Sequence, residues 1–374
     1  MKKILFLINT LKSGGAEKVL IDTVNSLDPN QYQVTVQTVL ADGENREGLS
    51  DHIRYKAMIH TKNGLLRRIL TNVLFKVLGA DMMYRFFVKD DYDYEIAFLE
   101  GHPTKIISKS TNKTAKKYAW VHIDLNAYPN SAFAYGSSER EEAAYQIFDK
   151  IVCVSESVKR EFLKKYAVDA RKVVVVYNIV DDSVITECAK EPADLQVTEK
   201  PVLISVGRLV QQKGYDRLLR VHLRLMREGL THSLVVIGDG ELRNELSDFV
   251  QQNHLTDSVK FLGYQSNPHK YVSKADVFVC SSYAEGYSTV VSEAVLCGTP
   301  VLSTDVAGAN EPETNPRCSI IVENSEEALY ESMKELLMEP QRIQVLREDL
   351  ERRKASLKKD HLVSEFERIL FSEQ

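Results

Sequence analysis

Short apolar segments alternate with amphipathic segments along the first half of the chain. An apolar run at residues 4–8 is followed by a glycine-containing turn, an amphipathic segment at 16–27 and a second apolar run at 34–40. A short continuous apolar run is typical of a buried strand, and apolar positions three and four apart are typical of a helix. This order predicts strand, helix, strand, and further strands are predicted at 94–99, 118–121, 151–154 and 173–176.

The apolar pattern fades between residues 181 and 200, where we expect a linker, and restarts at Pro201. Apolar strands such as VLISVG and LVVIGDG then alternate with helices predicted at 215–227, 241–251 and 288–296. Continuously apolar strands are typical of parallel sheets with helices on both faces. The pattern therefore predicts an α/β protein with two Rossmann-like, doubly wound parallel-sheet domains. Their expected bounds are 1–190 and 200–355, with a C-terminal helix at 356–374 that returns to the first domain.

Charge and composition limit the classes of partner that the protein can have. The formal net charge is -5, so no overall positive field exists to recruit nucleic acid, and we expect no nucleic-acid partner. Residues up to Thr198 carry 27 Lys and Arg against 26 Asp and Glu, and the remainder carries 21 against 27. The more basic first half is the half expected to face an anionic partner. The five cysteines are scattered and never in C-x-x-C spacing, which favours reduced thiols in a cytoplasmic protein.

The N-terminus resembles a signal peptide only superficially. The apolar run of MKKILFLIN stops at Ile8 and no cleavage-like site follows, so a first strand is the better interpretation. No segment approaches the ~18 consecutive apolar residues that a membrane-spanning helix needs.

Ligands of open parallel sheets bind beyond the carboxyl ends of the strands, so the loops there are where we expect the site. The first such loop, SGGAE at 13–17, contains Gly14 and Gly15. Two glycines before a helix let backbone amides approach an anion at the positive end of the helix dipole. A turn from strand to helix also needs glycine for steric reasons about as often, so both interpretations stay open.

A second loop follows the strand VLISVG and reads GRLVQQKG. It contains Gly207, Arg208 and Lys213. A guanidinium and an ammonium group in such a loop suit a diphosphate, because Arg can bind it through two hydrogen bonds and Lys as a point charge. The alternative, two solvated surface cations, has about equal weight on spacing alone.

The segment AEGYSTVVSEA places Glu285 and Gly286 in a loop and Glu293 on a helix. Ser288 can cap that helix, whose first amides, including those of Thr289 and Val290, would then face the loop. Glu293 can accept hydrogen bonds from a ribose diol, and Glu285 can approach a sugar. The alternative is a surface turn residue for Glu285 and a helix charge near the dipole for Glu293.

His122 and Asp124 follow a predicted strand in the first half. A single histidine at a strand end is more often a packed polar residue than a catalyst. Asp91 and Asp93 form a D-x-D pair of the kind that holds a metal in many enzymes of a different fold, but they precede a strand in a densely charged stretch. We therefore expect no metal at this pair.

A basic amphipathic segment spans residues 62–79. Its apolar residues recur at helical spacing between Lys62, Arg67, Arg68 and Lys76, and it is typical of helices that lie on anionic membranes or hold an acceptor there. A core-facing helix with a basic outer face has equal weight. A second basic run follows, at Lys105, Lys109, Lys113, Lys116 and Lys117.

Together these segments resemble the family 4 glycosyltransferases over nearly the whole chain. One such segment is weak evidence, but nine in order at the expected junctions of strand and helix are highly specific. The nine are GGAE at 14–17, VCVSE at 152–156, YNIVD at 177–181, VGRLVQQKG at 206–214, IGDGELR at 237–243, FLGY at 261–264, AD-x-FV-x-SS at 275–282, EGYSTVVSEA at 285–294 and G-x-PV-x-x-TD at 298–305. Residues 65–88 have no counterpart that we can align.

The resemblance implies the GT-B fold, with two Rossmann-like domains facing across a cleft, and a retaining reaction that needs no metal or other cofactor. It implies that Arg208 and Lys213 hold the donor diphosphate, that Glu285 contacts the donor sugar and that His122 lies beside the anomeric carbon. These four form the predicted catalytic set. The implied donor-binding set is Gly14, Gly15, Gly207, Arg208, Lys213, Glu285, Gly286, Ser288, Thr289, Val290 and Glu293.

We therefore expect transfer of a hexosyl or N-acetylhexosaminyl group from a nucleotide-diphosphate sugar, with a UDP-sugar favoured over a GDP-sugar. The acceptor expected is a cell-surface glycan, or a lipid-linked one reached from the inner face of the membrane. Two alternatives stay open: a nucleotide-sugar epimerase of the same fold, which would convert donor without acceptor, and a non-catalytic subunit of a transferase. Intact Arg208, Lys213, Glu285 and Glu293 argue against the second.

Overall fold

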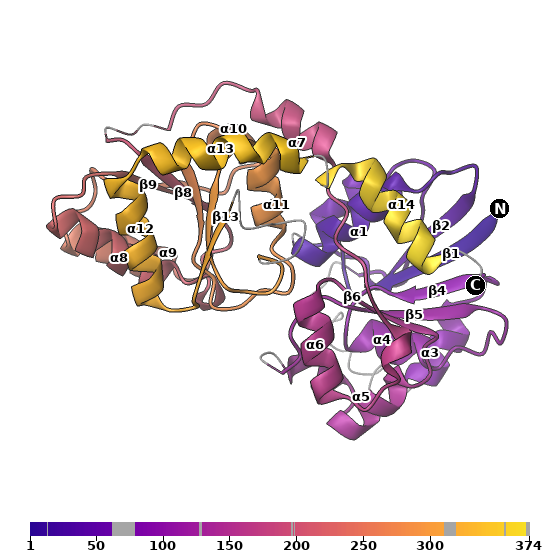
Figure 1. Cartoon of the computed structure of the whole chain (residues 1–374). Helices are drawn as coiled ribbons and strands as arrows, with labels where there is room; N and C mark the ends of the chain where they lie inside the picture. The colour runs from indigo at the N-terminus through magenta and orange to yellow at the C-terminus, as the bar shows by residue number, and fades with distance from the viewer. Residues whose placement is uncertain are drawn as a thin grey trace. The chain divides into compact units, whose positions relative to one another are not determined.

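The computed structural model describes residues 1–12, 14–61, 79–126, 129–195, 197, 199–309, 319–354 and 357–371. The chain divides into two compact units (Figure 1). Unit 1 consists of Met1–Ile179 and Leu362–Gln374, and unit 2 of Val180–His361.

Unit 1 is built on a parallel sheet of seven strands in the order β3-β2-β1-β4-β5-β6-β7. The order reverses beside β1, as in a doubly wound sheet. Its strands are β1 (Lys2–Ile8), β2 (Tyr32–Leu40), β3 (Arg54–Ile59), β4 (Tyr94–Ala97), β5 (Lys116–Val121), β6 (Lys150–Cys153) and β7 (Val173–Val175). Its helices include α1 (Gly15–Ser26), α3 (Gly79–Phe87), α4 (His102–Ile107), α5 (Ser138–Tyr145) and α6 (Glu156–Lys165). The sequence pattern missed β3, an edge strand whose first residues are exposed or only half-buried.

Unit 2 is built on a parallel sheet of six strands in the order β10-β9-β8-β11-β12-β13. Its strands are β8 (Val202–Val206), β9 (Ser233–Ile237), β10 (Val259–Gly263), β11 (Val277–Cys280), β12 (Val301–Thr304) and β13 (Ser319–Val322). Its helices are α7 (Asp182–Ala189), α8 (Tyr215–Arg227), α9 (Arg243–Gln252), α10 (His269–Val272), α11 (Thr289–Leu296), α12 (Glu326–Met338) and α13 (Gln341–Lys354). The central strands are buried along almost their whole length, as their continuous apolar sequences require.

The border between the units lies at 179/180, whereas the apolar pattern placed it between 190 and 200. The difference is α7, which forms inside the expected linker and belongs to unit 2. The Asn267 amide donates to the Cys188 carbonyl at 3.0 Å, and Ser273 Oγ donates to the Ala189 carbonyl at 2.8 Å. These contacts to α10 and its flanks, with buried Ile185, anchor α7 on unit 2.

The last helix, α14 (Lys359–Leu370), begins three residues after the predicted start, and the chain from Leu362 belongs to unit 1. Phe366 is 1% exposed and its ring lies 5.8 Å from that of Trp120 on β5. The Tyr118 hydroxyl donates to the Leu370 carbonyl at 2.8 Å. The C-terminal segment is therefore held by aromatic packing and by hydrogen bonds to its carbonyl groups.

A chain of polar side chains crosses the apolar core of unit 2. His222 Nδ1 lies 2.8 Å from His232 Nε2, and His222 Nε2 lies 2.9 Å from Ser258 Oγ. His232 Nδ1 lies 2.8 Å from the Leu230 carbonyl, so it must carry the proton. In the neutral pair His232 Nε2 accepts from His222 Nδ1–H, and the proton of Ser258 Oγ is shared between His222 Nε2 and the Leu255 carbonyl, which lies 3.2 Å from that hydroxyl. Both imidazoles are thus neutral, and burial lowers the pKa of His222 to about 3 and lowers that of His232.

Candidate active site

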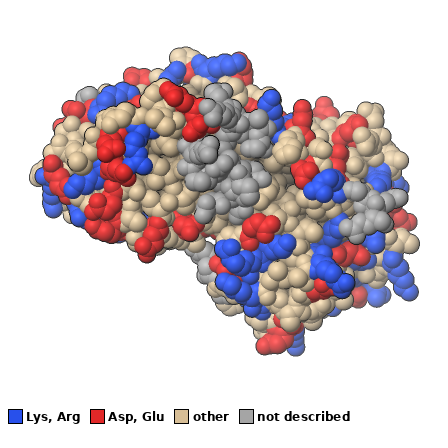
Figure 2. All heavy atoms as spheres, viewed as in Figure 1, with Lys and Arg blue, Asp and Glu red and all other residues tan. Residues whose placement is uncertain are grey.

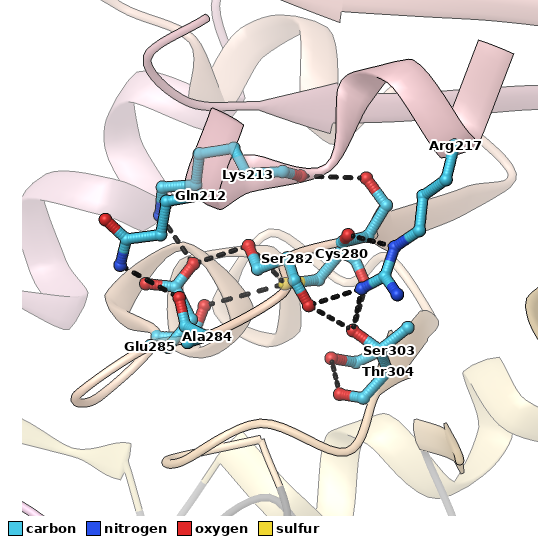
Figure 3. A network of polar contacts seen from close by, with 11 residues as sticks. Gln212, Lys213, Arg217, Cys280, Ser282, Ala284, Glu285, Ser303 and Thr304 are labelled. Atoms are coloured by element: carbon cyan, nitrogen blue, oxygen red, sulfur yellow. Dashed lines mark hydrogen bonds and ion pairs between the residues drawn. The ribbon is translucent and has the colours of Figure 1, made fainter. Parts of the chain in front are cut away.

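Lys213 and Glu285 meet in unit 2 at the carboxyl ends of two neighbouring strands. Lys213 ends a short 3₁₀ turn, Gln211–Lys213, after β8, and Glu285 lies in the loop after β11. Lys213 Nζ lies 2.6 Å from Glu285 Oε1, and Ser282 Oγ donates to the same oxygen at 2.6 Å (Figure 3). The side chains are 20% and 9% exposed, so water screens this pair poorly. The sequence suggested both residues but not that they pair.

The backbone around this pair is tightly packed. Gly214 has a φ of +63°, and a Cβ there would overlap the Ser281 carbonyl oxygen. Gly238 has a φ of +137°, and a Cβ there would overlap the carbonyl oxygen of Gly207. Only glycine fits at these two positions, because both the dihedral and the space exclude a side chain. The predicted donor residue Gly207 therefore lies between the strand ends, where a Cβ would be 3.0 Å from the Tyr215 hydroxyl.

Arg208 extends from the same loop and is exposed. Its backbone is fixed, since the Leu209 amide donates to the Asp239 carbonyl at 3.0 Å. The structure thus places Arg208 and Lys213 on one loop at the carboxyl end of β8, but only Lys213 is partly buried beside a carboxylate. An exposed guanidinium and a shielded ammonium beside one strand end are suited to bind an anion in water.

The first turn of α11 differs from the expectation in one respect. Ser288 precedes the helix, but its side chain makes no capping hydrogen bond in the described structure. Ser288 is 2% exposed and its Oγ lies 3.9 Å from Cys280 Sγ at the end of β11. The predicted side-chain cap is wrong because Ser288 is packed against the strand. Gly286 is buried, and Thr289 and Val290 are half-buried in the first turn.

Glu293 lies further along α11 and is 8% exposed. Its Oε2 lies 3.3 Å from His269 Nε2 on α10. The sequence alternative for Glu293 was a helix charge near the dipole, but the carboxylate is instead buried beside an imidazole. His269 was not predicted from the sequence, because a single histidine in a four-residue helix carries no periodic signal.

Arg217 is a second residue that sequence analysis missed. It lies in the first turn of α8 and is 2% exposed. Its guanidinium donates to the carbonyls of Ser281 and Ser282 at 2.8 and 2.6 Å (Figure 3). The available signal was that Arg217 lies on the same face of the helix as the buried Leu218 and Val221, where residues are normally apolar.

In unit 1, Gly14 and Gly15 precede and begin α1. The φ of Gly14 is -151°, which any residue adopts, and a Cβ there would meet only the Glu17 side chain. A Cβ on Gly15 would meet no described atom within 4 Å. The strand-to-helix turn itself therefore does not require glycine at either position. This weakens the alternative that Gly14 and Gly15 are present for steric reasons alone.

His122 follows β5 in unit 1 and lies beside a carboxylate that the sequence did not single out. The His122 and Ile123 amides both donate to Glu100 Oε1, the latter at 3.1 Å. His122 Nε2 lies 3.1 Å from the Phe98 carbonyl, at the end of neighbouring β4. Burial lowers the pKa of His122 to about 4 and raises the pKa of Glu100 to about 7. His122 is therefore a neutral, packed histidine at this strand end.

The structure describes the cations of only one of the two basic segments. Lys62, Arg67, Arg68 and Lys76 lie outside the described residues. In the run at 105–117, Lys105 Nζ donates to the Ala134 carbonyl at 2.5 Å and Lys117 Nζ to that of Asn112 at 2.8 Å. Lys116 Nζ lies 3.8 Å from Asp149 Oδ1, so three of the five cations make contacts within unit 1. On the face shown in Figure 2, Lys and Arg side chains lie among Asp and Glu side chains. Within the described ranges, no helix has the length and apolarity to cross a bilayer.

Asp93 of the D-x-D pair has a structural role. Asp93 Oδ2 accepts the Lys3 amide at 2.7 Å, at the start of β1. Across the residues that the structure describes, no group of three or more His, Cys, Asp or Glu is arranged to hold a metal ion.

Comparison with known proteins gives the class. The family model described as glycosyl transferases group 1 matches residues 189–355, and the model described as glycosyltransferase family 4 matches residues 112–184. The chain is 26% identical over 356 residues to an N-acetylgalactosamine-N,N'-diacetylbacillosaminyl-diphospho-undecaprenol 4-alpha-N-acetylgalactosaminyltransferase of Campylobacter jejuni, covering 90% of each chain. It is 25% identical to an uncharacterized glycosyltransferase of Haemophilus influenzae, covering 81% of this chain and 80% of that one.

Solved structures show the same fold. HepE of Anabaena, crystallised with UDP and glucose, matches with a TM-score of 0.76 and 19% identity over all of both chains. TarM of S. aureus matches with a TM-score of 0.77 and 12% identity, covering 100% of this chain and 99% of that one. The two parallel sheets thus form the predicted GT-B fold of a sugar-transferring enzyme. The protein belongs to glycosyltransferase family 4.

Proposed function

We propose that the protein transfers a hexosyl or N-acetylhexosaminyl group from a nucleotide-diphosphate sugar, a UDP-sugar in preference to a GDP-sugar, with retention of configuration and without a metal ion. The acceptor we propose is a cell-surface glycan, or one that is linked to a lipid. The observation that carries the proposal is the shielded pair of Lys213 and Glu285 at the ends of neighbouring strands.

This pair offers the two chemistries that such a donor needs. The ammonium group of Lys213 and the guanidinium group of Arg208 are suited to the diphosphate, whose charge grows as the bond to the sugar breaks. The carboxylate of Glu285 is suited to accept hydrogen bonds from the sugar hydroxyls. Because Lys213 and Glu285 contact each other now, a bound diphosphate would compete for Lys213 and release Glu285 to the sugar.

The proposed reaction breaks the bond between the anomeric carbon and the diphosphate oxygen. A new bond forms from that carbon to an acceptor oxygen, and the acceptor proton ends on the released nucleotide diphosphate. Arg208 and Lys213 would stabilise the leaving group, which is the role that a metal has in other transferases. We propose Gly14, Gly15 and the first turn of α11 as further phosphate contacts, Glu293 as the ribose contact and His122 as a neighbour of the anomeric carbon.

Relatives support the donor and acceptor classes. The Campylobacter relative is named for transfer of N-acetylgalactosamine to a diphospho-undecaprenol-linked sugar, and HepE was crystallised with UDP and with UDP-glucose. An undecaprenol chain lies in a membrane, so we propose that unit 1 approaches the inner face of the cell membrane. Residues 62–79 would supply the contact, and Arg85 and Phe86 are exposed further along α3.

A donor screen tests the proposal first. A nucleotide sugar that binds only the folded state stabilises it by about 2.7 kcal/mol at 100 times its dissociation constant. We expect a rise in melting temperature with one UDP-sugar, transfer to a glycan acceptor that persists in EDTA, and a product that keeps the anomeric configuration by NMR. Conversion of the donor without an acceptor would instead indicate an epimerase. Loss of transfer in EDTA, restored by a divalent ion, would refute metal independence.

Membrane contact has its own test. Arg67→Glu with Arg68→Glu is expected to reduce co-sedimentation with anionic vesicles, because each basic residue near such a surface contributes about 1 kcal/mol. Lys109→Glu with Lys113→Glu is the matched control, since it changes the net charge of unit 1 equally. If both variants lose the same amount of vesicle binding, the binding depends on overall charge and not on residues 67 and 68. If the wild type does not bind the vesicles at all, the membrane proposal is wrong.

A further inference from the structure

Arg217 is almost completely buried, yet all of its hydrogen bonds within the described structure end on neutral oxygens. Besides the Ser281 and Ser282 carbonyls, its guanidinium contacts Asn324 Oδ1 at 2.8 Å and Thr304 Oγ1 at 3.4 Å. The ring of Tyr283 lies over it at 4.1 Å. A charge that is buried without a contacting carboxylate costs free energy, which a protein tolerates where the charge has a role.

The two carbonyl acceptors of Arg217 belong to one short segment, the three residues that follow β11. Arg217 holds the Ser281 and Ser282 carbonyls, and Asn324 Nδ2 donates to the Tyr283 carbonyl at 2.7 Å. Thr304 Oγ1 also donates to the Ser282 carbonyl, at 2.8 Å. Every peptide carbonyl from 281 to 283 is therefore fixed, and Glu285 lies two residues further on.

The same segment is joined to the loop that carries Lys213. Ser281 Oγ donates to the Lys213 carbonyl at 3.0 Å, and the Tyr283 amide donates to the Gln212 carbonyl at 2.8 Å. Gln212 Nε2 donates to the Ala284 carbonyl at 2.9 Å. These hydrogen bonds join residues 212–213 to residues 281–284, an arrangement that we call the backbone clamp. One of its two segments carries the ammonium group of Lys213, and the other leads to the carboxylate of Glu285 and is held by Arg217 (Figure 3).

We propose that Arg217 is a positioning residue, which holds the 281–285 segment so that Glu285 meets the donor sugar. The inference rests on the proposed function, because it assigns Glu285 to the sugar. Arg217 acts on the sugar end of the donor and leaves the nucleotide end, assigned to Arg208 and Glu293, unchanged.

Arg217→Lys separates these effects. Lysine keeps the charge but cannot bind two carbonyls through a planar fork. The expected result is a kcat reduced by about 10- to 100-fold, because small displacements of a positioning group cost that much. The dissociation constant of UDP alone should stay within about two-fold of wild type, while the added affinity that the sugar gives is lost. Arg224→Met, on the exposed face of the same helix, is the control and should change neither.

A double-mutant cycle with Glu285→Gln distinguishes positioning from general stability. If Arg217 acts through Glu285, Arg217→Lys should change kcat by less than about two-fold once Glu285 is replaced, although it still lowers the melting temperature. If the reductions of kcat by Arg217→Lys and by Glu285→Gln multiply in the double variant of an active enzyme, the inference about Arg217 is wrong and the proposed function stands. If the wild type binds UDP but transfers no sugar, both the proposed function and the inference about Arg217 are wrong.

Asn324→Ala keeps the inference testable if Arg217→Lys does not fold. Asn324 is exposed and shares the clamp through the Arg217 guanidinium and the Tyr283 carbonyl. Its loss should reduce kcat several-fold with UDP affinity unchanged. A kcat equal to wild type in this folded variant would overturn the role of the clamp.

Discussion

The neutral histidine pair in the core of unit 2 makes stability depend on pH in a way that one substitution can isolate. The substitution is His222→Gln, which keeps hydrogen-bonding capacity but cannot take up a proton near neutral pH. His222 is fully buried between His232 and Ser258, so protonation would turn the Ser258 proton fully to the Leu255 carbonyl and leave a charge in an apolar core.

The magnitude follows from the pKa of His222, which burial lowers from 6.5 to about 3. Between these values the unfolded chain binds a proton that the folded chain does not, so stability falls as pH drops below the unfolded pKa. Each pH unit costs about 1.4 kcal/mol, and at pH ~4.5 the loss from His222 is about 2.7 kcal/mol. The Gln variant does not incur this loss, although one weakened hydrogen bond costs it about 1 kcal/mol at every pH.

Hydrogen exchange of the β9 amides, followed by mass spectrometry, reports the opening free energy of unit 2 directly. We expect the variant to be less stable than the wild type by about 1 kcal/mol at pH ~8 and more stable by about 1–2 kcal/mol at pH ~4.5. His254→Gln, at an exposed histidine of the same unit, should give a difference that does not change with pH. A constant difference between wild type and His222→Gln over the same range would show that His222 is not held neutral.

Three further substitutions test the site and the packing. Glu285→Gln should lower kcat by ~10²-fold or more while UDP affinity stays within about three-fold, since the lost contact is to the sugar; equal activity would refute the site assignment, and exposed Glu245→Gln is its control. Gly238→Ala should destabilise unit 2 by more than ~3 kcal/mol in urea unfolding, because strain at positive φ adds to overlap with a carbonyl oxygen. Gly229→Ala, at a φ of +81° and with open space around the added Cβ, should cost only ~1 kcal/mol. Phe366→Ala should cost ~3–5 kcal/mol and expose Trp120, visible as a red shift of its fluorescence.

The sequence alone was sufficient for the class of fold and for most elements. Strands such as β8, β9 and β11 are continuously apolar, and helices such as α8 follow the helical period. Both patterns are local, so they are readable without the rest of the chain. The exceptions have physical causes. Edge strand β3 carries little apolar signal, and α7 contributes mainly Ile185 to the core, so contacts to the flanks of α10 decide its place.

The candidate site divides in the same way. The sequence determined which residues could bind a diphosphate and a sugar, because loops at strand ends with cations, carboxylates and glycines are recognisable locally. Only the tertiary structure decided that Lys213 pairs with Glu285, that Ser288 packs on β11 instead of capping α11, and that Glu100 holds the amide of His122. Arg217 shows why: its partners are more than sixty residues away in sequence, and such contacts exist only once the parallel strands have brought their carboxyl ends together.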